Sequence, residues 1–145
     1  MFMKQLSVFV ENKQGALAKV MALLSDNGIN MRAVSIADTQ DFGILRVIVK
    51  EVDKAKDILK SNNVIVSVTE VVGVELADTP GALSKVMAVL DKGNVNLEYV
   101  YAFVTPGKAE SAYMVVRAGD NAKATEVLNA AGIHTLTEED LEAML

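Results

Sequence analysis

Two stretches of this chain read almost alike: GALAKVMALL at residues 15–24 and GALSKVMAVL at residues 81–90. The copies start 66 residues apart, and each follows a polar corner, at residues 11–14 or 77–80. Downstream of each copy, a turn leads to an asparagine, Asn30 or Asn96. Because the match extends to positions expected to be exposed, it indicates an internal duplication, and this duplication decides the fold.

The length and hydrophobicity of the chain favour two small domains. The chain has 145 residues, of which 51% are hydrophobic, and its mean hydropathy is +0.28. One unit of this repeat buries only a marginal core by itself. The high hydrophobic content indicates apolar surface for packing between units. We therefore predict two domains, residues 1–70 and 71–145, with no flexible linker between them.

Charge and composition exclude several classes of function. The net charge is −5 and no basic stripe is visible, which argues against nucleic-acid binding. The absence of cysteine excludes disulfides and thiolate metal sites. The first residues do not resemble a signal peptide, and no apolar run approaches the roughly 20 residues that span a bilayer. We expect a cytoplasmic protein with neither a nucleic-acid nor a membrane partner.

Hydrophobic periodicity predicts the same order of elements, βαββαβ, in both halves. We expect helices to begin at Asp53 and Asp120 as N-caps, and a further short helix to begin near Thr137. The fold class is therefore α+β, with each antiparallel sheet covered by helices on one face. The strands are expected at residues 6–10, 30–38, 42–50 and 64–68, then at residues 71–76, 96–104, 111–117 and 133–136.

Aromatic side chains alternate along the strand expected at residues 96–104. Tyr99, Tyr101 and Phe103 point to the face that the helices do not cover, because alternate strand residues lie on opposite faces. An uncovered face of three rings suggests a homodimer interface. The alternative is that the rings fill space within their own chain.

Each polar corner leads into the N-terminus of a helix. There the first backbone N–H groups lack internal acceptors and the helix dipole is positive, so a carboxylate could bind. Gly15 and Gly81 have no Cβ and permit close approach. Asn12 or Asp78 could hold an ammonium group, so that the two ends of a free amino acid would be matched. The alternative is that Asn12, Asp78 and Thr79 are ordinary helix caps.

The corner motifs resemble the ACT domain family, in tandem over nearly the whole chain. They read NKQGAL at residues 12–17 and DTPGAL at residues 78–83, with GIN at 28–30 and NVN at 94–96 downstream. The resemblance implies two ferredoxin-like units and regulatory binding of an amino acid where ACT units meet. The ligand-contacting residues that it implies are Asn12, Gln14, Gly15, Ala16, Leu17, Asn30, Asp78, Pro80, Gly81, Ala82, Leu83 and Asn96.

The first half also resembles the regulatory subunit of acetohydroxyacid synthase, through LSVFVEN at residues 6–12. We therefore keep two hypotheses: a non-catalytic amino-acid-binding module, or an interaction protein or enzyme subunit without its own ligand site. No acid–base pair or nucleophile with a base can be assembled, so catalytic residues, cofactors and metals are all expected to be absent. His134, the only histidine, has no visible catalytic partner.

Overall fold

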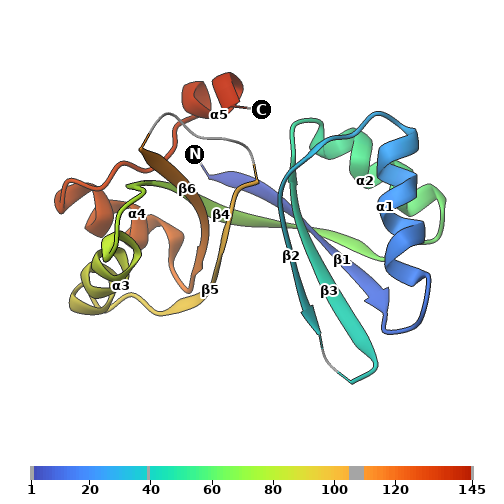
Figure 1. The fold of residues 1–145 in the computed structure, drawn as a ribbon, viewed down its shortest axis with the longest axis horizontal. Coiled ribbons are helices and arrows are strands. Elements are labelled where there is room, and N and C mark those ends of the chain that lie inside the picture. Colours follow the sequence, from blue (N-terminus) through green and yellow to red (C-terminus); the bar gives the residue numbers. More distant parts are fainter. Residues whose placement is uncertain (1, 39, 105–109, 145) are drawn as a thin grey trace. The chain divides into compact units, whose positions relative to one another are not determined.

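The computed structural model describes residues 2–38, 40–104 and 110–144. Contacts between residues divide the chain into two compact units. The first unit is residues 4–69, and the second is residues 70–145 together with residues 1–3. The elements, labelled in Figure 1, are β1 (Met3–Glu11), α1 (Ala16–Asp26), β2 (Met31–Asp38), β3 (Phe42–Val49), α2 (Val52–Ser61), β4 (Val66–Ala77), α3 (Ala82–Lys92), β5 (Leu97–Ala102), β6 (Ser111–Ala118), α4 (Asn121–Ala130) and α5 (Glu138–Met144).

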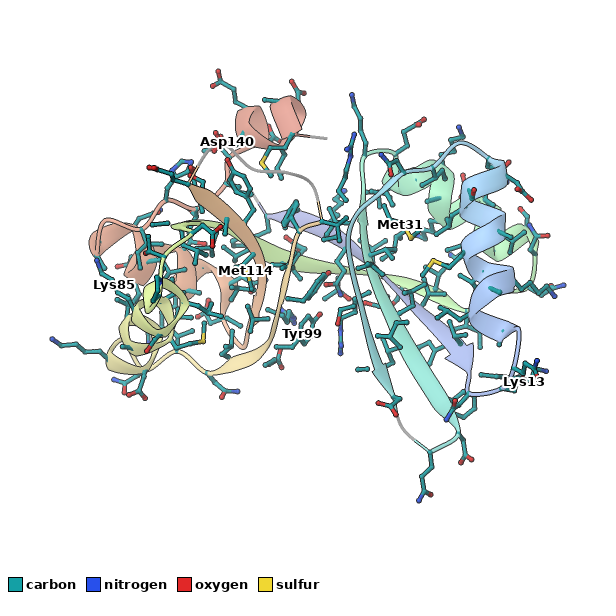
Figure 2. The ribbon with its side chains drawn as sticks, in the orientation of Figure 1. Lys13, Met31, Lys85, Tyr99, Met114 and Asp140 are labelled. Carbon is teal, nitrogen blue, oxygen red and sulfur yellow. The ribbon has the colours of Figure 1, made fainter. Side chains whose placement is uncertain are left out.

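The first unit is an antiparallel sheet with α1 and α2 on one face (Figure 1). The strand β1 lies between β3 and the first residues of β4, and β2 is next to β3. In the β1–β3 register, Leu6 is opposite Val47 and Val8 is opposite Leu45. These alternate residues point toward the helices and are fully buried, as the period of two requires. Val20 and Leu24 of α1, Ala55 and Leu59 of α2, and the neighbouring Met31 (Figure 2) complete this core.

The second unit repeats the arrangement with residues 70–77 of β4 as its first strand. These residues pair with β6, which pairs in turn with β5, and α3 and α4 cover one face. Val72 and Val116 are opposite each other and pack on Val86, Leu90 and Leu128 of the helices. Asp120 is the N-cap of α4, as predicted: its Oδ1 accepts from the backbone N–H of Lys123 at 3.0 Å.

Three elements differ from the sequence prediction. The N-cap expected at Asp53 is Glu51, two residues earlier, and Asp53 lies in the first turn of the helix, where the dipole favours an acid. The strands expected at 64–68 and 71–76 are one continuous strand, β4. The strand expected at 133–136 is reduced to a single bridge between Val74 and Thr135.

Two expected features fall partly or wholly outside the described residues. Residues 105–107, whose sequence TPG predicts a turn, lie outside them, as does Leu145 of the expected C-terminal helix. The rest of that helix is confirmed as α5. Its start is a capping box, in which Thr137 N–H donates to Oδ2 of Asp140 at 2.8 Å and Asp140 N–H donates to Oγ1 of Thr137 at 3.2 Å.

The aromatic residues of the second unit are mostly buried in the single chain. Tyr101 and Phe103 each expose 9% of their surface. The rings of Tyr99 and Tyr101 stack at 6.3 Å between centroids, and Phe103 meets Tyr113 edge to face at 6.4 Å. Tyr101 and Phe103 are therefore largely covered within the single chain, and the homodimer interface stays a prediction. Within the described residues, no helix is long and apolar enough to cross a membrane.

Candidate functional site

Both corners are set by a glycine in the left-handed conformation. Gly15 has φ 85° and Gly81 has φ 87°, and each is the N-cap residue of its helix, α1 or α3. Residues with a Cβ rarely adopt this conformation, so glycine is required here for its backbone as well as for close approach. The stretch that the two copies share therefore begins at the residue that turns the chain into the helix.

Backbone hydrogen bonds hold each corner against the tip of the next hairpin. Asn12 N–H donates to the carbonyl of Asp41 at 3.0 Å, and Asp78 N–H donates to the carbonyl of Glu110 at 2.7 Å. The equivalence of these bonds shows that the duplication extends to the backbone of the corner. We call each of these bonds a corner clasp.

The interpretation of the corner side chains as helix caps is wrong. Neither Gly15 nor Gly81 is accompanied by a side-chain cap, and Thr79 is not the N-cap. The amide of Asn12 donates instead to the carbonyl of Gln40, at 3.3 Å.

The N-termini of α1 and α3 therefore keep free donors. The first N–H of α3, that of Ala82, donates to the carbonyl of Thr79 at 3.2 Å. Among the described residues, the N–H groups of Leu83 and Ser84 have no backbone acceptor. The same holds for the equivalent N–H groups of Leu17 and Ala18, again within the described chain. These are the orphan donors of a helix N-terminus, and they suit an anion.

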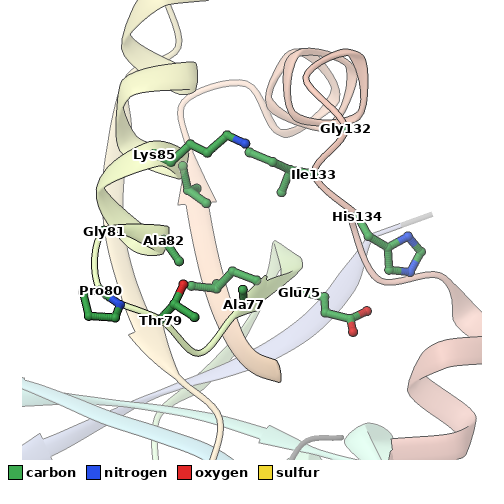
Figure 3. Close-up of a pocket in the computed structure, with 12 residues that line it drawn as sticks. Glu75, Ala77, Thr79, Pro80, Gly81, Ala82, Lys85, Gly132, Ile133 and His134 are labelled. Atoms are coloured by element: carbon green, nitrogen blue, oxygen red, sulfur yellow. The ribbon is translucent and has the colours of Figure 1, made fainter. Parts of the chain in front are cut away.

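A cavity of about 690 Å³ adjoins the corner of the second unit. We call it the second-unit cavity. In Figure 3, Gly81 at the start of α3 and Lys85 within it form one side, the segment after α4 forms the other, and Glu75 of β4 lies near His134. Its lining residues are Glu75, Leu76, Ala77, Thr79, Pro80, Gly81, Ala82, Lys85, Val86, Gly132, Ile133 and His134.

The charged groups of the second-unit cavity are of both signs. Oε1 of Glu75 accepts from the hydroxyl of Ser111 at 3.2 Å. Nε2 of His134 lies 2.7 Å from Oδ2 of Asp140, in α5. The backbone N–H of Thr137 and the imidazole of His134, in that order of importance, lower the pKa of Asp140 below its usual value. Among the described residues, Lys85 forms no ion pair, so its charge is available to a ligand.

The first unit has a matching cavity of about 480 Å³, which we call the first-unit cavity. It adjoins Gly15 and is bordered by β1, the start of α1 and the segment after α2. Its lining residues are Phe9, Val10, Glu11, Lys13, Gln14, Gly15, Ala16, Lys19, Val20, Phe42, Asn63, Val64 and Ile65. A smaller cavity of about 120 Å³ includes Asn12 and Leu17.

The structure brings half of the residues expected at the site to the two larger cavities. These are Gln14, Gly15 and Ala16 in the first unit, and Pro80, Gly81 and Ala82 in the second. Asn12 and Leu17 line the smaller cavity instead, and Asp78 and Leu83 line none of the three.

Asn30 and Asn96 lie away from the corner of their own unit. Each follows the C-terminus of a helix of 11 residues whose N-terminus is the corner. Such a helix is about 16 Å long. Within one unit, these asparagines therefore do not flank the cavity, and a role for them in binding stays a prediction.

Sequence reasoning did not identify four charged or polar residues that line the two cavities, which are Lys19, Lys85, Glu75 and His134. Lys19 and Lys85 occupy the same place in the repeated stretch, four residues after the glycine, and this repetition was an available signal. Glu75 and His134 carried no such signal, because His134 comes to the cavity from more than 50 residues downstream of the corner. No group of three or more potential metal ligands is present among the described residues.

The sequence profile of the ACT domain pair matches residues 1–145 of this chain. The chain belongs to the ACT domain pair family. The ACT resemblance of the two corner motifs is thereby confirmed, as is the α+β architecture of two βαββαβ units.

Two solved structures show how widely the ACT pair fold is shared. A protein from Bacteroides thetaiotaomicron is 42% identical with TM-score 0.88, and the match covers 97% of this chain and 96% of that one. The ligand-free regulatory subunit of aspartate kinase from Thermus thermophilus has TM-score 0.63 over 90% of this chain and 92% of that one. Its identity is 14%, so this second likeness concerns the fold alone.

Shorter matches connect this ACT pair to acetolactate synthase small subunits. The subunit of Buchnera aphidicola subsp. Baizongia pistaciae is 36% identical over 45 residues, which are 31% of this chain and 28% of the relative. The subunit of Buchnera aphidicola subsp. Schizaphis graminum is 34% identical over 53 residues, which are 37% of this chain and 34% of the relative. The matches thus span about a third of these relatives.

Proposed function

We propose that this ACT pair is a non-catalytic regulatory module that binds a free amino acid at its glycine corner. The observation that carries the proposal is the second-unit cavity, which places a cation, an anion and the free end of a helix around one space of about 690 Å³. Small-molecule sites typically have volumes of about 300–1,000 Å³. A zwitterion needs this combination of charges.

The charges suggest how the amino acid would be oriented. We orient its carboxylate toward the N-terminus of α3, where Gly81, Ala82 and the ammonium of Lys85 line the cavity. Its ammonium group is placed against Glu75, whose carboxylate keeps further acceptor capacity beyond the bond from Ser111. In this arrangement the partner of the ligand's ammonium group is Glu75, whereas the sequence analysis expected Asp78.

The expected affinity is modest. A free amino acid has few heavy atoms, so we expect a dissociation constant between micromolar and millimolar, or about −8 to −4 kcal/mol. Regulation of a partner would require a coupling free energy of about 1–3 kcal/mol.

The acetolactate synthase small subunits supply the class of partner that we propose, an enzyme of amino-acid biosynthesis. We also propose a homodimer, and light scattering of the purified chain tests it.

A thermal-shift screen of the twenty amino acids tests the proposal. At a hundred times its dissociation constant, a ligand adds about 2.7 kcal/mol to the free energy of unfolding and raises Tm by several degrees. Lys85→Met should weaken binding of the amino acid found. Lys92→Met, at the other end of α3, is the matched control and should not. If no amino acid raises Tm, the alternative of an interaction protein without its own ligand is favoured.

A further inference from the structure

The two cavities share a cation that the sequence repeat places at the same position. Lys19 and Lys85 each follow the corner glycine by four residues, and each lines the cavity of its own unit. Neither forms an ion pair among the residues that the structure describes. Each cavity therefore offers an anionic ligand one ammonium group that is not held in an ion pair.

The opposite walls of the cavities differ in chemistry at positions that the backbone shows to be equivalent. Phe9 N–H donates to the carbonyl of Ile65 at 2.9 Å, and Glu75 N–H donates to the carbonyl of His134 at 3.0 Å. The second unit thus has a carboxylate and an imidazole where the first has a phenyl ring and a branched alkyl group. The two units therefore share the cation and differ in the opposite wall, which is polar in the second unit and apolar in the first.

The apolar wall of the first-unit cavity is unusually exposed. The exposed fractions are 46% for Phe9, 51% for Phe42 and 69% for Ile65. Large apolar side chains gathered around a cavity mark a surface that a partner or ligand covers. The volume of about 480 Å³ is suited to a small molecule.

Among the residues that the structure describes, the first-unit cavity has no lining carboxylate outside an ion pair. Glu11 is the one carboxylate among its lining residues, and its Oε2 lies 3.0 Å from Nζ of Lys13. An ammonium group placed in this cavity would be desolvated against phenyl and alkyl groups, which is unfavourable without a partner. A carboxylate placed near Lys19, in contrast, gains a partner of opposite charge.

We propose that the first-unit cavity is a second binding site, for a small apolar monocarboxylate without an ammonium group. Lys19 holds the carboxylate, and Phe9, Phe42 and Ile65 cover the apolar part of the ligand. The two halves of the ACT pair therefore bind different classes of ligand. This site stands or falls independently of the amino-acid site proposed for the second unit.

The test uses the full chain and three probes of matched skeleton. The probes are 3-phenylpropanoate, phenylalanine, which adds an ammonium group, and 3-phenylpropanamide, which lacks the charge. Binding is followed by two-dimensional ¹H–¹⁵N NMR, with the amides of Gly15 and Gly81 reporting the two cavities separately. We expect 3-phenylpropanoate to shift Gly15 at millimolar concentration, and both other probes to bind there at least about fivefold more weakly.

Two substitutions distinguish the proposed site from non-specific binding. Lys19→Met should weaken 3-phenylpropanoate at Gly15 about five- to tenfold, because it removes one partly exposed charged contact. Phe9→Glu, which installs the residue of the second unit, should weaken it further. Lys85→Met is the matched control and should leave it unchanged. Thermal unfolding of each variant verifies that it is folded.

Three outcomes would overturn the proposal. The first is phenylalanine binding at Gly15 as tightly as 3-phenylpropanoate does. The second is equal weakening by Lys19→Met and Lys85→Met. The third is that no probe shifts the NMR signal of Gly15 while Phe9→Glu dissociates a dimer of this chain. That result would show that a second copy of the chain covers the apolar wall. A failure to bind amino acids at Gly81 would affect only the proposed function.

Discussion

Gly81→Ala is a direct test of the reasoning about the corner. At φ 87° an alanine is strained, and the cost of the left-handed conformation for a residue with a Cβ is about 1–2 kcal/mol. No atom lies within 4 Å of the added Cβ, so a steric clash contributes nothing. Alanine also restricts the unfolded chain more than glycine does, which stabilises the folded state by about 0.4–1 kcal/mol. The net loss in the free energy of unfolding is therefore about 0–1.6 kcal/mol, with a central value of about 0.8 kcal/mol.

Gly43→Ala is the matched control for this measurement. Gly43 has no positive φ, and its added Cβ would meet its nearest neighbours at 3.6–3.8 Å, an ordinary contact. Because both variants restrict the unfolded chain alike, the difference between them isolates the strain of about 1–2 kcal/mol. Gly15→Ala should resemble Gly81→Ala, since its φ is 85° and its surroundings are also open.

The assay is urea denaturation of each purified variant, with calorimetry as a second measurement. If the whole chain of 145 residues unfolds as one cooperative unit, the net loss corresponds to a fall in Tm of up to roughly 6 °C. If Gly81→Ala unfolds at the same urea concentration as Gly43→Ala, the corner does not depend on the left-handed glycine. The repeated GAL motif would then need another explanation.

Two further predictions concern the second unit. Asn121 is 8% exposed, and its amide donates to the carbonyl of Glu70 at 2.9 Å. Asn121→Ala should therefore lower the free energy of unfolding, measured by urea denaturation, by about 1–3 kcal/mol. An unchanged midpoint of the urea transition would contradict this prediction. The lowered pKa of Asp140 means that the stabilisation of α5 is present above about pH 4 and is lost as the pH falls through the folded-state pKa. The amide proton of Thr137 should report this loss in an NMR titration with a midpoint below that of an ordinary aspartate, and Asp140→Asn should abolish the step.

The sequence was sufficient to predict the duplication, the order of elements and the two corners. Val20 and Leu24 are four residues apart in the repeated stretch, a helical spacing, and the structure buries both in the core because they share one face of α1. The boundary between the units was harder. Residues 69 and 70 are threonine and glutamate, neither of which breaks a strand, and β4 runs through them.

The walls of the cavities could not be predicted from the sequence. Glu75 is six residues before its glycine and His134 is 53 residues after it, and nothing in the sequence pattern indicates that they share a cavity. Their meeting depends on the backbone bond between Glu75 and His134, which the sequence does not specify. The chemistry of a bound ligand therefore depends most on the residues for which sequence patterns are least informative.

The corner clasps have a consequence for engineering this protein. They are made by main-chain atoms, from the N–H groups of Asn12 and Asp78 to the carbonyls of Asp41 and Glu110. Substituting the side chains around them leaves these atoms in place. Phe9, Ile65 and the equivalent residues Glu75 and His134 can therefore be randomised to select new ligand specificities without redesigning the backbone of the corners.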